Sequence, residues 1–489
     1  MTVELVRNTD NIYDLLALCC KYLLDRTEAE HYDFWKFDDD EFDSVYDMIE
    51  SYTSEIIDKG HKTAYLKLKR EVCTLLSTGV SLEKCHAIVK YIDELVDVEI
   101  NNNAVKMPGF RKYNTLNHAY SSDVRIIPKI KDTFLKNEEG EFILKDPSEE
   151  KYSFFREEGE CYASCIDEVT HNYMIWDKSN VEKFPFTIIR IDEDSSLAKH
   201  FYHRNKVTIG IVPFTCKGIR DILNIKFEGD TFHVENMYKE ANEELKFRYK
   251  NIYMWSQNKD IDFLIYPEML MSEDIIDSIT DEELMNNGPK FIINGSVWTN
   301  YSNRAIATDL FGSRVFTYYK KCGFKYRENE KKYKEALDYT INKEYIILEI
   351  GGFGRIGVCI CKDLADENVL MFHKLINTNI LFVPAFSDSF QLRNDAKAMA
   401  SKYNCMTVFA NSCAAYCKHW SEDKGYDIGF IMIPAKLETS SDSYMKNYTA
   451  QKCYESCDSG CCCKVFTIAF DEIKEYNGML SIDIQGEDD

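Results

Sequence analysis

The stretch that decides the fold is GRIGVCICKDL, residues 354–364. Its apolar residues form a short run that predicts a buried β-strand, and Lys362 and Asp363 end that run with charge. Cys359 and Cys361 lie two residues apart, so both side chains are expected on the same side of the strand. Only Cys361 stands where the chain leaves the sheet. We therefore expect Cys361 to be a reactive thiol and Cys359 to be a buried neighbour.

Two other predicted strands end in a charged group. The strand of residues 263–266 is ended by Pro267, which leaves Glu268 at its carboxyl tip. A β-hairpin with its turn at Gly312-Ser313 delivers Lys320 at its far end. Open α/β folds build their sites at the carboxyl ends of strands. The sequence thus predicts a carboxylate, an ammonium group and a thiol at three strand ends.

These three groups suit nucleophilic catalysis. A free thiol with a pKa of about 8.5 is mostly protonated at neutral pH, so a nucleophilic cysteine needs a base or a stabilising cation beside it. Glu268 and Lys320 could supply one each. The sequence alone leaves open whether burial raises the pKa of Glu268 while Lys320 stays charged.

Strands and helices alternate through the C-terminal part of the sequence. The strand VTIGIV (207–212) is followed by apolar residues at mostly three- and four-residue steps from Val234 to Trp255, which predicts a long amphipathic helix. With the strand before Glu268, these elements form a β-α-β unit. Further along we expect a hairpin ending at Cys361, a helix over about 366–375, a strand over 379–386, a helix over about 393–403 and a strand ending at Asn411.

The first 205 residues show different patterns. Apolar residues recur at helical spacing between Leu68 and Val96, whereas three asparagines and a Pro-Gly pair within residues 99–110 predict a linker. The sequence therefore predicts three domains: a helical region (1–105), a mixed α/β or β-rich region of unknown role (106–205) and the region that holds the three strand ends (206–489).

The formal charge of −23 disfavours direct binding to nucleic acid or to an anionic membrane, unless there is a local basic patch that the sequence does not display. The N-terminus lacks a basic segment followed by an apolar one. The most apolar early stretch (15–20) is far shorter than the roughly 20 residues of a membrane span. We expect a cytoplasmic protein without membrane contact.

The 18 cysteines are spread over a long acidic chain, which favours reduced thiols over a disulfide framework. The cluster CYESCDSGCCC (453–463) has a spacing that matches no standard zinc site. A metal site there stays open as an alternative to a reduced, partly buried turn. We expect no metal ion and no organic cofactor.

From about Val207 onward the motifs resemble those of the nitrilase, or carbon-nitrogen hydrolase, superfamily. YPEM is similar to the family's strand that ends in Pro-Glu, YYKK to its Tyr-x-Lys motif, and GRIGVCICKD to its Gly-Arg-Ile-Gly-x-x-Ile-Cys-x-Asp signature. The resemblance implies a triad of Glu268 as general base, Lys320 as the cation and Cys361 as the nucleophile. Many members carry a second glutamate eight residues after the lysine, which implies Glu328 as a secondary candidate.

The resemblance covers about 280 residues and also implies a fold and a reaction. The implied fold class is α+β, a C-terminal αββα sandwich of mixed sheets with helices outside, preceded by a helical and mixed N-terminal region. The implied activity is a thiol hydrolase that cleaves a non-peptide C–N bond of a small amide, carbamoyl compound or nitrile through a thioester-type intermediate. Family members often dimerise, so we expect a homo-oligomer. Cys322-Gly323 replaces the family's usual His-Leu, which leaves the substrate class open.

Three alternatives remain at this stage. A cysteine-histidine hydrolase would use His373 or His419 as its base. A catalytically silent nitrilase-like domain would serve as a binding or regulatory module. An effector hydrolase would be gated by the N-terminal region.

Overall fold

The structure is a computed structural model of the 489-residue chain. It describes residues 3–9, 12–26, 46–47, 61–103, 111–113, 124–128, 131–136, 142–144, 173–191, 195–204, 206–257, 259–279, 288–299, 301–328, 330–341, 344–351, 353–387, 391–416, 426–434, 443–450, 463–476 and 479–486. His419 and nearly all of the cysteine cluster, residues 453–462, lie outside these ranges. No helix within these ranges combines the length and the apolarity that crossing a membrane requires.

The chain divides into two compact units. One comprises residues 1–107, 112–131 and 144–187, and the other comprises 108–111, 132–143 and 188–489. Residues 106–205 therefore contribute to both units. The short strands β1 (Arg111–Tyr113), β3 (Lys131–Lys136), β4 (Phe142–Leu144) and β6 (Phe186–Ile191) have residues in both units, and β3 pairs with β4.

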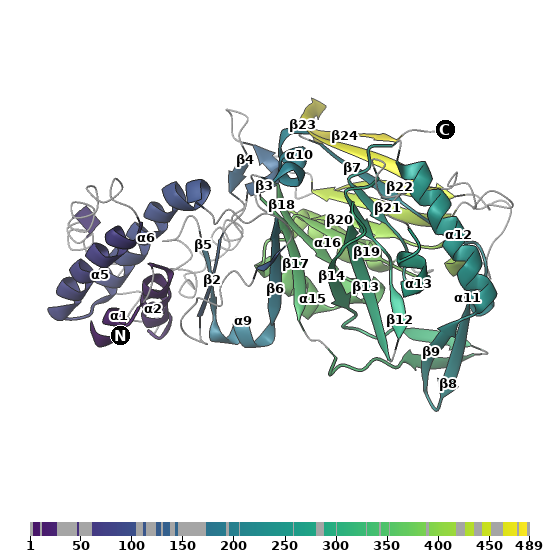
Figure 1. Ribbon diagram of the computed structural model, residues 1–489, viewed down its shortest axis with the longest axis horizontal. Helices are drawn as coiled ribbons and strands as arrows, with labels where there is room; N and C mark the ends of the chain where they lie inside the picture. The colour runs from purple at the N-terminus through teal and green to yellow at the C-terminus, as the bar shows by residue number, and fades with distance from the viewer. Residues whose placement is uncertain are drawn as a thin grey trace. The chain divides into compact units, whose positions relative to one another are not determined.

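The first unit is mainly helical (Figure 1). Its helices and strands are α1 (Val3–Arg7), α2 (Ile12–Leu24), α5 (His61–Ser77), α6 (Leu82–Asn103), β2 (Val124–Pro128), β5 (Tyr173–Asp177) and α9 (Lys178–Lys183). Leu16, Val72 and Ile88 belong to one apolar core shared by α2, α5 and α6. The predicted linker is wrong at its start, because α6 continues through all three asparagines to Asn103. Extending an existing helix costs less than starting one, which outweighs the weak helix propensity of asparagine.

The second unit contains most of the strands. Up to the Lys320 hairpin its elements are β6 (Phe186–Ile191), α10 (Ser196–Arg204), β7 (Lys206–Ile211), α11 (Ile219–Ile222), β8 (Leu223–Glu228), β9 (Thr231–Met237), α12 (Lys239–Ser256), β10 (Phe263–Ile265), α13 (Glu273–Ile276), β11 (Phe291–Ile293), β12 (Val297–Thr299), β13 (Ser302–Asp309) and β14 (Arg314–Tyr319). After it follow β15 (Lys325–Glu328), β16 (Lys331–Glu335), β17 (Tyr345–Ile350), β18 (Gly354–Val358), η1 (Cys361–Ala365), α15 (Glu367–Leu375), β19 (Ile380–Pro384), α16 (Gln391–Tyr403), β20 (Met406–Ala410), η2 (Cys413–Tyr416), β21 (Tyr426–Pro434), β22 (Ser443–Ala450), β23 (Lys464–Tyr476) and β24 (Met479–Gly486).

Two mixed sheets pack face to face in this unit. One has the order β12-β13-β11-β10-β7-β23-β24 with β14 beside β13, and the other runs from β6 through β17-β18-β19-β20-β21-β22. The ring centroids of Phe263 in β10 and Phe382 in β19 are 5.0 Å apart across the interface. A Cβ atom added at Gly429 in β21 would come within 3.0 Å of the Cγ2 atom of Ile211 in β7, so the layers are in close contact.

Helices cover the outer faces of both sheets (Figure 1). α12 packs its Leu245 and Ile252 into the same apolar cluster as Ile292 of β11. On the other side α15 lies so close to β18 that a Cβ atom at Gly357 would be 2.5 Å from the His373 ring. The predicted α+β class with a C-terminal αββα sandwich is therefore confirmed.

The long helix predicted from Val234 to Trp255 begins later in the chain than the sequence suggested. Val234 lies in β9, which pairs antiparallel with β8, and α12 begins only at Lys239. Phe232 and Val234 are buried at alternate positions of β9, so a two-residue period operates where the three- and four-residue steps suggested a helix. The β-α-β unit itself is confirmed, because β7 and β10 pair in parallel.

A smaller sheet extends this unit. It has four strands in the order β15-β16-β9-β8, and β16 pairs antiparallel with β15 and parallel with β9. The aromatic rings of Phe227, Tyr326 and Tyr333 pack together on its inner face. This sheet matters because the last residue of β16, Glu335, is fully enclosed in the site described next.

Candidate active site

Glu268 lies where the two large sheets meet at their strand ends. It follows β10, and its backbone N–H donates a hydrogen bond to the carbonyl oxygen of Ala385, just beyond β19, at 3.2 Å. The next residue, Met269, has a positive φ of 68°, and its N–H donates to the Ser296 hydroxyl at 2.8 Å. A residue other than glycine adopts this backbone conformation at an energetic cost, so the surroundings hold the loop in place. The Glu268 side chain is fully buried.

Lys320 follows β14 at the end of the β13–β14 hairpin and lies next to Glu268. Its backbone N–H donates to the carbonyl oxygen of Asn303 at 2.8 Å, which continues the pairing of the two strands. Its Nζ atom donates to Glu268 Oε1 at 2.6 Å and to Glu335 Oε2 at 2.7 Å, and all three side chains are inaccessible to solvent. A buried ammonium group needs such paired carboxylates to remain charged.

Cys361 occupies a turn and not the end of a strand. β18 ends at Val358, and Cys361 starts the helical turn η1 with a positive φ of 47°. The prediction that the strand reaches Cys361 is therefore wrong, and the two cysteines differ in backbone conformation. Cys359 still continues the pairing of the sheet through its N–H bond to the Phe382 carbonyl oxygen at 3.0 Å, and it is completely buried. Cys361 retains 5% exposure.

The electrostatics of the cluster follow from burial and from mutual attraction. Burial raises the pKa of Glu268, and the ammonium group of Lys320 partly opposes that shift. Burial also disfavours the charge on Lys320, but the carboxylates of Glu268 and Glu335 outweigh it and raise the lysine pKa. The pKa of the Cys361 thiol is raised by burial and by Glu268, while Lys320 and the backbone N–H of Phe386 lower it. In the resting site Lys320 is therefore charged and the Cys361 thiol is protonated.

Glu335 is the second carboxylate of the site, and sequence reasoning missed it. Its Oε1 atom accepts hydrogen bonds from Asn303 Nδ2 at 3.0 Å and from Trp298 Nε1 at 3.3 Å. Its Oε2 atom accepts from Lys320 Nζ and from the Phe324 backbone N–H, the latter at 3.1 Å. The sequence KKYKE of β16 could have indicated it. Residues at alternate positions of a strand face the same side, so Glu335 lies with Tyr333 on the inner face.

The structure does not bring Glu328 into this cluster. Glu328 lies in β15, its side chain is 21% exposed, and it pairs with Arg220 at 3.4 Å. The reason is geometric, because β15 leads the chain away from Lys320 and only β16 brings it back. Counting eight residues from the lysine reaches the outgoing strand, whereas the carboxylate that contacts Lys320 lies on the returning strand.

Asn303 connects the two carboxylates. Its side-chain Nδ2 atom donates to Glu268 Oε1 at 2.9 Å as well as to Glu335 Oε1. Glu268 Oε1 thus receives hydrogen bonds from both Lys320 and Asn303. The other oxygen, Oε2, is buried without a hydrogen bond from any described residue. It is the oxygen left available to accept a proton from the nearby thiol.

Asp363 ties the lysine-bearing hairpin to the turn of Cys361. Its Oδ1 atom accepts from the backbone N–H groups of Lys321 and Cys322 at 3.0 and 2.7 Å. Its Oδ2 atom accepts from the Tyr318 hydroxyl at 3.0 Å and from the Ile360 N–H at 3.1 Å. Burial raises the pKa of Asp363 to about 7, although Lys320 and the hydrogen bonds from Ile360, Cys322 and Tyr318 lower it. The Asp363 side chain therefore links the hairpin that carries Lys320 to the turn that carries Cys361.

His373 does not take part in this arrangement. It lies in α15 on the outer face of the sheet, where its Nδ1 atom contacts the Thr378 hydroxyl at 3.0 Å and burial lowers its pKa to about 3. His419 lies outside the described residues. Among the residues that the structure describes, no three His, Cys, Asp or Glu side chains gather in a way that could hold a metal ion.

No known family model matches the chain, and no curated protein matches it. Solved structures with a similar arrangement include Nit3 of Saccharomyces cerevisiae, a member of the nitrilase superfamily, with 13% identity over 50% of this chain and 90% of that chain at a TM-score of 0.31. They also include an amidase of Nesterenkonia sp. AN1, with 10% identity over 52% and 95% of the two chains at 0.31. A glutamine-dependent NAD+ synthetase of Acinetobacter baumannii is 12% identical over 57% of this chain and 47% of its own, at 0.35.

Proposed function

We propose that the chain is a thiol hydrolase that cleaves the C–N bond of a small amide, carbamoyl compound or nitrile, with Glu268, Lys320 and Cys361 as its catalytic residues. The observation that carries the proposal is the buried contact of Lys320 with Glu268 beside the Cys361 turn. The residue types, the burial and the directions of the pKa shifts fit a base, a cation and a nucleophile.

The reaction begins with transfer of the thiol proton of Cys361 to Glu268 Oε2. The thiolate then attacks the substrate carbon, and negative charge grows on the oxygen of an amide or the nitrogen of a nitrile. A preorganised ammonium group such as Lys320 lowers the barrier of this step by about 3 kcal/mol. Because Lys320 is held by two carboxylates, its position and charge are set before the substrate arrives.

For an amide, the tetrahedral intermediate collapses and the C–N bond breaks. Glu268 returns its proton to the leaving nitrogen, which departs as ammonia or an amine and leaves an acyl thioester on Cys361. Glu268 then takes a proton from water, and the resulting hydroxide attacks the thioester carbonyl. The C–S bond breaks, the carboxylic acid product leaves, and Glu268 returns its proton to the Cys361 thiolate, which restores the free thiol and the carboxylate. One buried carboxyl group thus serves as acid and base in turn.

Ammonia release from a panel of small amides, ureides and nitriles tests this proposal. The wild type is expected to release ammonia from at least one class, and Cys361→Ala is expected to abolish that release. Cys359→Ala is the matched control, because it removes a buried thiol of the same segment and should cost stability and little activity. Absence of release from every compound would favour a catalytically silent binding module.

A further inference from the structure

The outer face of the hairpin formed by β15 and β16 carries four basic side chains, called the basic array below. Lys325 lies directly across from Lys334, and Arg327 lies directly across from Lys332. All four residues are exposed. Neighbouring strands lie about 5 Å apart and alternate residues along a strand about 7 Å apart, so the array is a compact rectangle of positive charge.

Ordinary roles of surface lysines do not account for the array. None of the four side chains forms an ion pair within the described part of the chain, although acidic residues outnumber basic ones by 82 to 59. Like charges directly across two strands destabilise a hairpin. Lysines on an edge strand can block unwanted pairing, and β15 is such an edge. That explanation does not extend to Lys334, which is paired with Lys325 of β15 on one side and with Thr231 of β9 on the other.

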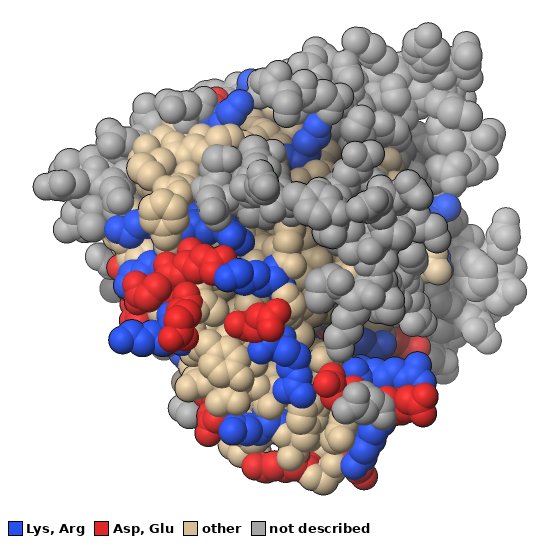
Figure 2. Space-filling view, turned by 90° about the vertical axis from the view of Figure 1, so that its right-hand side faces the viewer, with Lys and Arg blue, Asp and Glu red and all other residues tan. Residues whose placement is uncertain are grey.

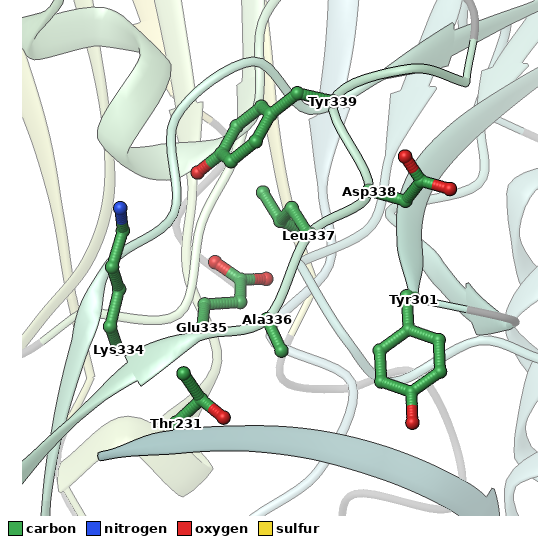
Figure 3. Close-up of a pocket in the computed structure, with 8 residues that line it drawn as sticks. All are labelled: Thr231, Tyr301, Lys334, Glu335, Ala336, Leu337, Asp338 and Tyr339. Atoms are coloured by element: carbon green, nitrogen blue, oxygen red, sulfur yellow. The ribbon is translucent and has the colours of Figure 1, made fainter.

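A hollow adjoins the array at Lys334 (Figure 3). It has a volume of about 350 Å³ and is lined by Thr231, Tyr301, Lys334 and residues 335–339. Tyr301 and Tyr339 are 45% and 46% exposed, which is unusual for large aromatic side chains. Figure 3 shows the Tyr339 ring directed toward Lys334, whose Nζ atom is 5.9 Å from the ring centroid.

Acidic groups also lie near this positive charge. Asp338 lines the hollow, where its Oδ1 atom accepts hydrogen bonds from the N–H and hydroxyl groups of Thr340, and the exposed Asp230 pairs with Lys331 at 3.2 Å. The carboxylate of Glu335 is engaged by Lys320 inside the candidate active site. Glu228 lies across from Thr231, and the exposed Glu330 lies in the hairpin turn. On the face drawn in Figure 2, acidic and basic side chains are interspersed.

We propose that the basic array and the hollow together bind a small polyphosphate. Lysine and arginine side chains bind phosphate oxygens through charge-assisted hydrogen bonds. The array presents four such side chains over the span of two or three linked phosphates. A free inorganic polyphosphate and a nucleoside polyphosphate share this chemistry. The exposed tyrosines favour the nucleoside form, since a base can stack on an aromatic ring in the hollow.

The basic array takes no part in the proposed hydrolysis. β16 contributes Lys332 and Lys334 to its outer face and Glu335 to its inner face, so the two sites share this strand, and Glu335 also lines the hollow. No side chain of the array belongs to the candidate active site. Binding can be measured without turnover. Failure of the polyphosphate proposal and failure of the hydrolase proposal are therefore distinguishable.

Isothermal titration calorimetry on the full chain tests the proposal with two probes, inorganic triphosphate and adenosine triphosphate. The wild type is expected to bind both. The double variant Lys332→Gln/Lys334→Gln should lose about tenfold or more in affinity for each probe and show a shallower salt dependence. The matched control Lys239→Gln/Lys397→Gln removes two exposed lysines from α12 and α16 and should change neither affinity.

A further variant separates the two sources of phosphate. Tyr339→Ala should weaken binding of adenosine triphosphate and leave binding of inorganic triphosphate unchanged. The proposal is overturned if neither probe binds, or if the Lys332→Gln/Lys334→Gln variant binds both as tightly as the control variant does. Tighter binding of a single-stranded oligonucleotide or an acidic peptide than of either probe would also overturn it, in favour of a macromolecular partner.

Discussion

Positive charge is buried in one region of the chain, at Lys320, and exposed in a neighbouring one, the basic array. Lys320 is removed from solvent and held by two carboxylates at 2.6 and 2.7 Å. Five to fourteen positions further on, the basic array is exposed and without ion pairs among the described residues. A buried charge must be compensated by other groups of the fold, whereas an exposed charge is stabilised by water and remains able to bind a ligand. The two regions meet at Glu335, so the placement of charge distinguishes the proposed catalytic site from the proposed binding surface.

The largest expected effect comes from removing the buried charge. Lys320→Met leaves Glu268 and Glu335 buried without their ammonium partner and should lower the free energy of unfolding by about 3–5 kcal/mol. The same change at exposed Lys332 should alter it by less than about 0.5 kcal/mol. Urea unfolding at pH 7 and at pH 5 measures both. The loss should shrink at pH 5, because protonation of the carboxylates removes the uncompensated charge. Equal effects of the two variants would contradict the comparison.

The base is expected to dominate the reaction rate. Glu268→Gln keeps the size of the side chain and an oxygen for Lys320, but it cannot take the thiol proton, so kcat/KM should fall by about 10²- to 10⁴-fold. In the wild type the raised pKa of Glu268 should place the acid limb of kcat/KM above about 4.3, the ordinary glutamate value. Activity is lost as the pH falls through this limb, because the base becomes protonated. An acid limb at or below the ordinary value would show that burial does not tune this group.

Glu335 and Glu328 offer a matched test of which second carboxylate serves the site. Glu335→Gln removes one of the two charges that hold Lys320 and should lower kcat by about tenfold or more, with a smaller effect on KM. Glu328→Gln breaks only a partly exposed contact with Arg220 and should leave both constants unchanged. Steady-state kinetics of the two variants decides between them. The reverse pattern would show that the hairpin is placed differently during turnover.

The smallest effect is expected at Asn303, which touches both carboxylates and no reacting atom. Asn303→Ala removes a donor to the ionised form of Glu268, so the acid limb of kcat/KM should move to higher pH. The accompanying loss of stability should be about 1–3 kcal/mol, because two buried acceptors lose a partner. A purely structural role would lower stability without moving the pH profile.

The sequence predicted the parts of this account that depend on local pattern. Short apolar runs ended by proline or charge identified the strands before Glu268 and Lys320, and the structure brings these two residues into contact. The position of Glu335 beside Lys320 could not be predicted from local pattern, because it depends on how β16 pairs with β15 and β9. The turn of Cys361, with its positive φ, is also tied to a distant part of the chain, because Asp363 accepts hydrogen bonds from the N–H groups of Lys321 in the hairpin and of Ile360 in the turn. Pairing between distant strands decides such positions, and a local window does not contain it.

The central claim is that Cys361 is the nucleophile. Identifying the residue that carries the acyl group during turnover tests this claim most directly. The wild type is mixed with an amide that releases ammonia, quenched in acid during turnover, and digested for peptide mass spectrometry. The account predicts an acyl mass on the peptide that contains Cys361 and on no other cysteine peptide. Ammonia release with the acyl group on another residue, such as Cys322, or with no acylated residue at all, would contradict it.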